Sequence, residues 1–223
     1  MTKARIDIGE EAVAKKVFVW AIDWPGWCRG GKDRDLAIAA LIDHAERYAK
    51  VANAAGLEFP AIDAEALRTV ETVAGNGGTD FGVPSIVTKL DRKRVMTAEA
   101  ERLASLVHAA WATVDRVAAM APSTLRKGPR GGGRDTAKVV EHVIGADRAY
   151  AREIGVRLSE PAADDDHAAV RAERTAILEA LRQPSDGSPM ADRKWTLRYA
   201  ARRIAWHALD HAWEIDDRTE PDP

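Results

Sequence analysis

The chain changes its pattern of apolar residues near residue 96, and this change limits the folds that it can adopt. Before that point, short apolar runs are broken by glycine and proline; after it, apolar residues recur every three or four positions in alanine-rich segments. A period of 3.6 residues indicates amphipathic helices, whereas short β-branched runs indicate strands. We therefore predict a small α+β domain over residues 1–95 and an all-α four-helix bundle over residues 96–223.

The composition is that of an ordinary globular protein. The 33 basic and 35 acidic residues leave a formal net charge of −2, which disfavours binding of the whole surface to nucleic acid or anionic lipid. No apolar run approaches the roughly 18 residues of a membrane helix, and the single cysteine, Cys28, cannot form an intramolecular disulfide. We expect a cytoplasmic protein without membrane association.

Short apolar runs separated by turn residues predict the α+β character of the first half. β-branched and aromatic residues over 16–23, and alternating ones over 67–74, favour strands. The Pro25-Gly26 pair predicts a turn, because proline presets φ and glycine tolerates positive φ. The expected elements are a strand near Ile6 and Ile8, strands over 16–23, 27–30 and 67–74, and a helix that begins at Asp33 and stops at Gly56.

The second half predicts four amphipathic helices joined by loops. Thr97 is a suitable N-cap for the first, and glutamates follow in its first turn, where the helix dipole favours negative charge. The second helix is expected over residues 134–158, the third from the acidic run 164–166 to Leu181, and the fourth over 192–217. Four such helices favour an up-and-down bundle, with a crossover connection as the alternative.

Two histidines of the last helix are spaced as metal ligands often are. His207 and His211 lie on one helical face, because four residues turn a helix only about 40° past a full turn. Both border the buried stripe through Leu197 and Ile204; the alternative is two partly buried histidines with ordinary hydrogen bonds. His142 in the second helix is the candidate third ligand, although the helical wheel sets it more than about 90° from the apolar centre of that helix.

Two segments of the second half carry a family resemblance. They are Glu141-His142-Val143-Ile144-Gly145-Ala146-Asp147-Arg148-Ala149-Tyr150 and Trp206-His207-Ala208-Leu209-Asp210-His211. Residues 97–223 resemble the DinB/YfiT-like superfamily of metal-binding four-helix bundles, which has one histidine early in its second helix and an i, i+4 pair in its fourth. The resemblance implies that His142, His207 and His211 hold a divalent metal ion. Family members with assigned activity include thiol S-transferases and a maleylpyruvate isomerase, which use thiols such as mycothiol, bacillithiol or glutathione.

The chemistry of such a centre follows from its ligands. Three neutral imidazoles leave a divalent ion at least one open position, as in catalytic sites; zinc is the first expectation, with nickel and iron as alternatives. A thiol bound to the ion loses its proton and becomes a nucleophile, whereas a bound water would support hydrolysis. Glu214, where the family often has glutamine, and Asp210 are the candidate catalytic groups. Arg202 and Arg203 are candidates to bind a carboxylate of the thiol or substrate.

The first half has a separate and shorter resemblance. The strand from Val17, the turn Asp23-Trp24-Pro25-Gly26-Trp27-Cys28 and the helix after Asp33 are similar to HicB-like antitoxin domains, which combine three strands, one helix and a fourth strand. The resemblance implies homodimer or protein–protein contacts through residues 1–95 rather than chemistry.

These observations lead to one main hypothesis and two alternatives. The main hypothesis is a metal-dependent enzyme of S-transferase or isomerase type, which joins a low-molecular-weight thiol to a small-molecule electrophile. The first alternative is a non-catalytic metal-binding interaction protein whose N-terminal domain recruits a partner. The second is a metal-dependent hydrolase.

Overall fold

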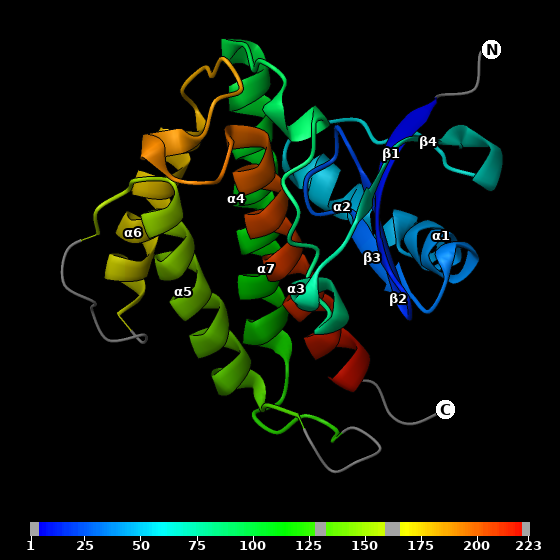
Figure 1. The fold of residues 1–223 in the computed structure, drawn as a ribbon. Coiled ribbons are helices and arrows are strands. Elements are labelled where there is room, and N and C mark those ends of the chain that lie inside the picture. Colours follow the sequence, from blue (N-terminus) through cyan, green and yellow to red (C-terminus); the bar gives the residue numbers. More distant parts are fainter. Residues whose placement is uncertain (1–4, 128–132, 159–165, 220–223) are drawn as a thin grey trace.

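The four strands of the first half form a single sheet in the order β3-β2-β1-β4 (Figure 1). The computed structural model describes residues 5–127, 133–158 and 166–219. The strands are β1 Ile6–Val13, β2 Lys16–Ala21, β3 Cys28–Gly31 and β4 Leu67–Ala74. β1 and β3 pair antiparallel with β2, whereas β4 runs parallel to β1. Each strand predicted from the sequence is therefore present, and the α+β character of the first half is confirmed.

Helices cover both faces of the sheet, which explains why almost all of β2 is buried. Val17 and Val19 belong to the same apolar cluster as residues of helix α1 (Arg34–Asp43), whereas Phe18 and Trp20 pack with Trp206 of the last helix, α7 (Leu197–Thr219). The Phe18 and Trp206 rings meet edge to face with centroids 6.3 Å apart. Alternate side chains of a strand point to opposite faces of the sheet, so the single strand β2 contributes to two apolar clusters.

Gly9 of β1 permits the close approach of Trp20. The two residues are opposite each other in the β1–β2 register. A Cβ atom at Gly9 would lie 2.3 Å from the Trp20 ring, which no packed structure tolerates. Glycine is therefore required here by packing and not by its backbone angles.

The helix predicted from Asp33 to Gly56 is two helices, α1 Arg34–Asp43 and α2 Ala45–Ala54. The Asp33 side chain caps α1 by accepting a hydrogen bond from the Leu36 N–H at 2.9 Å. The backbone leaves helical geometry at His44, with ψ near 1°. The bend lets Tyr48 donate a hydrogen bond to the Pro25 carbonyl at 2.8 Å, so tertiary contacts override the helical periodicity.

Four long helices make up the described part of the second half, which confirms its helical character. They are α4 Thr97–Met120, α5 Thr136–Glu153, α6 His167–Leu181 and α7 Leu197–Thr219, with the short segment η3 Met190–Asp192 before α7. The first half has three further short segments, η1 Ala64–Ala66, α3 Gly77–Asp80 and η2 Leu90–Arg92. Each of the four long helices contacts the other three. None of the described helices has both the length and the apolar character needed to cross a membrane.

The helix ends differ from the predicted ones for local reasons. Thr97 is the first residue of α4 and not its cap, which is Met96 without a side-chain hydrogen bond. α5 ends before Gly155, whose φ of +77° breaks the helix. α7 begins at Leu197, because Ala191 and Asp192 adopt positive φ angles. The acidic start of the third helix is supplied by Asp166, which caps α6; residues 164 and 165 lie outside the described residues.

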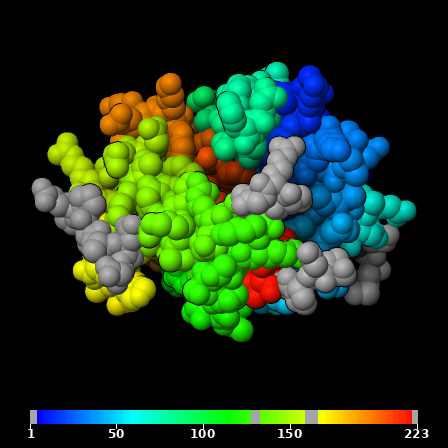
Figure 2. Space-filling view, turned by 90° about the horizontal axis from the view of Figure 1, so that it is seen from below, coloured from blue at the N-terminus to red at the C-terminus, as the bar shows by residue number. Residues whose placement is uncertain are grey.

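α7 lies between the sheet and α5 and contacts α4, α5, α6 and η2 (Figure 1). Gly26 of the Pro-Gly turn packs against Ala205 and Leu209 of α7, and its φ of +93° confirms the predicted turn. Seen from below, the helices and the sheet half form one continuous body (Figure 2). One buried apolar cluster runs through both halves. That residues 1–95 and 96–223 are separate domains stays a prediction.

Candidate metal centre

Three histidine rings from two helices converge on one point. His207 and His211 lie one turn apart on α7, and His142 lies on α5. Each ring offers a nitrogen atom, and these three atoms all lie within 4.8 Å of one another. The Nε2 atoms of His142 and His207 are 3.2 Å apart. The sequence-predicted triad is thus brought together by the fold.

His142 reaches α7 despite its unfavourable position on the helical wheel. The wheel assumes one buried stripe, but α5 contacts α4, α6 and α7 and is therefore buried over a wider arc. Val143 and Tyr150 are buried, and the neighbouring face of α5 turns His142 towards α7. A helix with three neighbours can place a functional side chain well away from its apolar centre.

The donor set fits a divalent metal ion. Two nitrogens bound to a tetrahedral zinc at about 2.05 Å lie about 3.3 Å apart, close to the 3.2 Å between His142 Nε2 and His207 Nε2. Burial, with the nearby His211, Arg203 and His142, lowers the pKa of His207 to about 2. Burial and His211 also lower the pKa of His142. Both rings are therefore neutral at pH 7 and have a lone pair for a metal. An N–H···N hydrogen bond between the two rings is the alternative account of their contact.

A carboxylate and an arginine orient His211. His211 Nδ1 donates a hydrogen bond to Glu214 Oε2 at 2.8 Å, and Arg218 donates to the other carboxylate oxygen at 2.8 Å. The hydrogen bond from His211 is the main reason why the pKa of Glu214 is lowered. Since an ionised carboxylate only accepts, the proton of His211 is on Nδ1 and the lone pair of Nε2 is available to the centre. Glu214 thus acts through His211.

Arg218 is a site residue that the sequence analysis missed. Its i, i+4 spacing from Glu214 is the signal that could have identified it, because such pairs meet on a helix surface. The Arg218 side chain is only 13% exposed, and its ion pair with Glu214 holds the carboxylate in place.

Arg203 and Tyr150 border the centre on the side of the N-terminal half of α7. The Tyr150 ring lies 5.6 Å from the His207 ring. The Arg203 guanidinium lies 5.4 Å from the Tyr150 centroid and 4.7 Å from that of Trp206. Burial raises the pKa of Tyr150, while the charge and hydrogen bond of Arg203 oppose this rise. The sequence alone assigned Tyr150 no role at the site.

Arg202 and Asp210, two further predicted site residues, are engaged elsewhere. Arg202 is 5% exposed and donates hydrogen bonds to Asp91 Oδ2 at 2.7 Å and to the Ile86 carbonyl at 3.0 Å. Asp210 forms an ion pair with Arg29 of β3 at 3.0 Å. These contacts give no support to a binding role for Arg202 or a catalytic role for Asp210.

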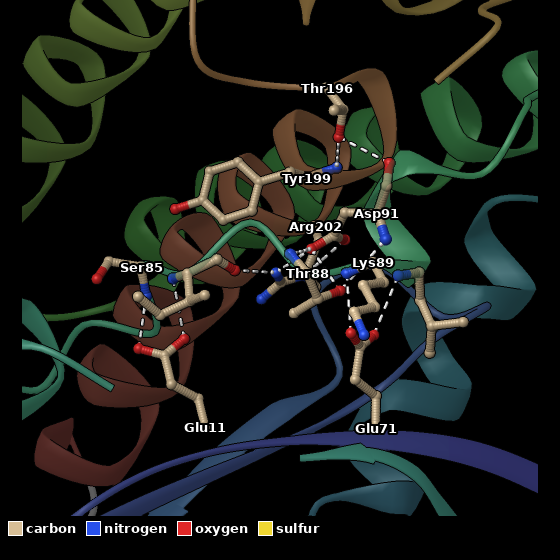
Figure 3. Close-up of polar contacts among 11 residues, drawn as sticks. Glu11, Glu71, Ser85, Thr88, Lys89, Asp91, Thr196, Tyr199 and Arg202 are labelled. Atoms are coloured by element: carbon tan, nitrogen blue, oxygen red, sulfur yellow. Dashed lines mark hydrogen bonds and ion pairs between the residues drawn. The ribbon is translucent and has the colours of Figure 1, made fainter. Parts of the chain in front are cut away.

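Arg202 belongs to a buried polar network that holds residues 85–91 against the sheet and α7 (Figure 3). Glu11 of β1 is fully buried and accepts hydrogen bonds from the Ser85 and Ile86 N–H groups, both at 3.0 Å. Glu71 of β4 accepts hydrogen bonds from the Lys89 and Leu90 N–H groups, at 2.8 and 3.0 Å. The network fixes the position of α7, and with it the two histidines, relative to the sheet.

The chain's own cysteine does not take part in the centre. Cys28 is buried beside Trp20, and burial raises the pKa of its thiol to about 12. Such a thiol carries no nucleophilic thiolate at neutral pH. Any thiol chemistry at the three histidines therefore requires a thiol from outside the chain.

Comparison with known proteins adds no assignment. No family model matches the chain, and neither a curated protein nor a solved structure is significantly similar to it.

Proposed function

We propose that this protein is a metal-dependent enzyme that activates a low-molecular-weight thiol at His142, His207 and His211. The observation that carries the proposal is the convergence of three ring nitrogens within 4.8 Å on helices α5 and α7. We further propose that α4 to α7 form a DinB-like four-helix bundle, which the mutual contacts of these helices support. The reaction class is S-transfer to a small electrophile, or isomerisation by reversible thiol addition.

The residues of the centre differ in their roles: some hold the ion, and others control access to it. His207 is 7% exposed, so water is largely excluded from one side of the centre, whereas His142 is partly exposed and leaves the other side open. Glu214 keeps the lone pair of His211 directed to the centre. A divalent ion, zinc in the first instance and nickel or iron otherwise, supplies the charge that favours thiolate over thiol at neutral pH.

Metal binding is the first test. The protein, freed of metal by a chelator, should take up about one zinc or cobalt ion per chain, as a three-histidine site does. His207→Ala and His142→Ala should each weaken binding at least about 10-fold, because each removes a ligand. His108→Ala is the matched control, since His108 lies exposed on α4. Failure of the unmodified protein to bind either ion would overturn the proposal.

Thiol conjugation is the second test. The zinc-loaded protein should accelerate the reaction of glutathione, or of another small thiol, with 1-chloro-2,4-dinitrobenzene, followed by the absorbance of the thioether. The rate should fall to the uncatalysed value in His207→Ala and stay unchanged in His108→Ala. Metal binding without acceleration for any thiol in a panel would overturn the enzymatic part and favour a metal that only stabilises the helices.

A further inference from the structure

Three residues of α7 that face the centre are spaced by four. Arg203, His207 and His211 follow one another at i, i+4 and i+8, so they form one stripe along the helix. Four residues rise about 6 Å along the axis, so Arg203 lies one turn beyond the metal-ligand pair. The Tyr150 ring bridges the two positions, because it contacts both the His207 ring and the Arg203 guanidinium.

Arg203 differs from the neighbouring arginines of α7 in its lack of a carboxylate partner among the residues described. Arg202 is paired with Asp91, and Arg198 is paired with Glu99. Within the described ranges, no carboxylate forms an ion pair with Arg203, and its buried Nη1 atom has no hydrogen-bond partner. The aromatic rings of Tyr150 and Trp206 hold the guanidinium in place instead. A charged group held by two rings but left without a counter-charge is poised for an anion.

Two residues that follow Arg203 on α7 also have a buried ring nitrogen without a partner in the described part of the chain. The Nε1 of Trp206 and the Nδ1 of His207 have no hydrogen-bond partner among the described residues. Nδ1 is the nitrogen of His207 that points away from His142, because Nε2 makes that contact. Buried donors without acceptors are costly, and an acceptor-only group such as a carboxylate removes this cost.

The charges around the centre favour the same kind of ligand. The charge of Glu214 is balanced by Arg218, and Asp210 is paired with Arg29. Arg134, at the start of the α5 segment, adds a second positive charge close to the histidines. The centre therefore attracts anions even before the charge of a metal ion is added.

We propose that Arg203 is an anion-binding residue, and that the thiol bound at the three-histidine centre carries a carboxylate held by this guanidinium. The inference rests on the proposed function and deepens it by naming the chemical class of the thiol. Arg203 and His142 are both only partly buried, so a small ligand can reach each of them from solvent. A planar guanidinium binds a carboxylate through two parallel hydrogen bonds, which a neutral amide cannot reproduce.

The test compares two thiols of equal size on the cobalt-loaded protein. 4-Mercaptobutanoate and 4-mercaptobutanamide are titrated while the visible absorption of the bound cobalt reports the occupancy of the centre. Four-carbon thiols are chosen because their carboxylate chelates the ion poorly. The unmodified protein should bind the carboxylate thiol about 10-fold more tightly or better. In Arg203→Gln this preference should fall to about that given by the charge of the metal alone.

Two further variants serve as controls. Arg152→Gln removes an exposed charge from α5 and should keep the preference of the unmodified protein. Arg203→Lys keeps the charge but loses the planar fork, so its preference should lie between the other two. If Arg203→Gln does not retain cobalt, Arg203→Lys decides: a reduced preference supports the inference, and an unchanged one overturns it.

The outcomes separate the two proposals. An undiminished preference in Arg203→Gln, or no preference in the unmodified protein, overturns the anion-binding role while leaving metal and thiol binding intact. Absence of cobalt absorption bands in the unmodified protein overturns the proposed function itself, and the inference falls with it.

Discussion

At the scale of single residues, Glu214 decides how well the centre can hold a metal ion. Its carboxylate lies between His211 and Arg218, with one oxygen 2.8 Å from each partner. A charged acceptor on the far nitrogen of a ligand ring fixes the ring and makes it more basic. A glutamine at this position, as the DinB-like pattern often has, would keep the hydrogen bond but lose the charge.

Substitution of Glu214 should therefore weaken metal binding in two steps. We expect a loss of about 10-fold in zinc affinity for Glu214→Gln and of about 10–100-fold for Glu214→Ala. Affinities are measured by competition with a coloured chelator. Glu141→Gln is the control, because the Glu141 side chain is 42% exposed and pairs with the exposed Lys138 of the same helix. Equal affinities for Glu214→Ala and the unmodified protein would show that the carboxylate does not orient a ligand.

Local spacing made part of the centre predictable, and long-range contacts made the rest unpredictable. The i, i+4 geometry of His207 and His211 follows from helix periodicity alone. The pairing of Arg202 depends on Asp91, which is 111 residues away along the chain, whereas Arg203 has no carboxylate partner among the residues that the structure describes. No pattern within α7 distinguishes the two arginines, which are adjacent and of the same type.

At the scale of elements, α7 is the helix that joins the sheet to the centre. Its Arg202 side chain faces the sheet half, where it lies 4.3 Å from the Trp20 centroid, and its Arg203 side chain lies over Tyr150 of α5. Successive residues of a helix point about 100° apart, so one turn serves both neighbours. The strands were predictable because their β-branched runs are local. The bend at His44 was not, because it depends on contacts of Tyr48 with the Pro25 turn.

Breaking the Arg202–Asp91 pair should destabilise the whole chain. Both side chains are at most 7% exposed, so Arg202→Met leaves a buried carboxylate without its counter-charge. We expect a loss of about 3–5 kcal/mol in the free energy of unfolding, measured with urea. Lys138→Met, which breaks an exposed pair, should cost only about 0–1 kcal/mol.

A double variant identifies the cause of this loss. Asp91→Asn keeps an acceptor for the N–H and hydroxyl groups of Thr88, which Asp91 binds at 2.9 and 3.0 Å, but removes the charge. Arg202→Met combined with Asp91→Asn should therefore recover much of the stability lost in the single variant. No recovery would mean that the packing of Arg202 between Trp20 and Tyr199, and not its charge, stabilises the fold.

At the scale of the whole molecule, three helices meet around a second buried charge. Asp147 of α5 is 5% exposed, accepts a hydrogen bond from Trp111 of α4 at 3.1 Å and pairs with Arg174 of α6 at 3.2 Å. Arg174 also binds Asp115 of α4 through two contacts of 2.9 Å. This network ties α4, α5 and α6 together at a distance from the sheet, and it makes the stability of the helical half depend on pH.

The sign of this dependence follows from the pKa of Asp147. Burial raises the pKa of this carboxyl to about 6, above its usual value of 3.8, although Arg174 and the Trp111 hydrogen bond oppose the rise. The folded protein therefore binds a proton at Asp147 more tightly than the unfolded chain does. Between pH 7 and pH 4 this group alone should increase the free energy of unfolding by about 2 kcal/mol as the pH falls.

Asp147→Asn isolates this contribution, because an amide keeps an acceptor for Trp111 but does not titrate. Urea unfolding of both proteins is compared at pH 4, 5.5 and 7, with the metal removed so that the histidines contribute equally to each. The free energy of the unmodified protein minus that of Asp147→Asn should rise by about 2 kcal/mol from pH 7 to pH 4. A difference that stays constant over this range would mean that Arg174 keeps Asp147 ionised, and that burial does not control this carboxyl.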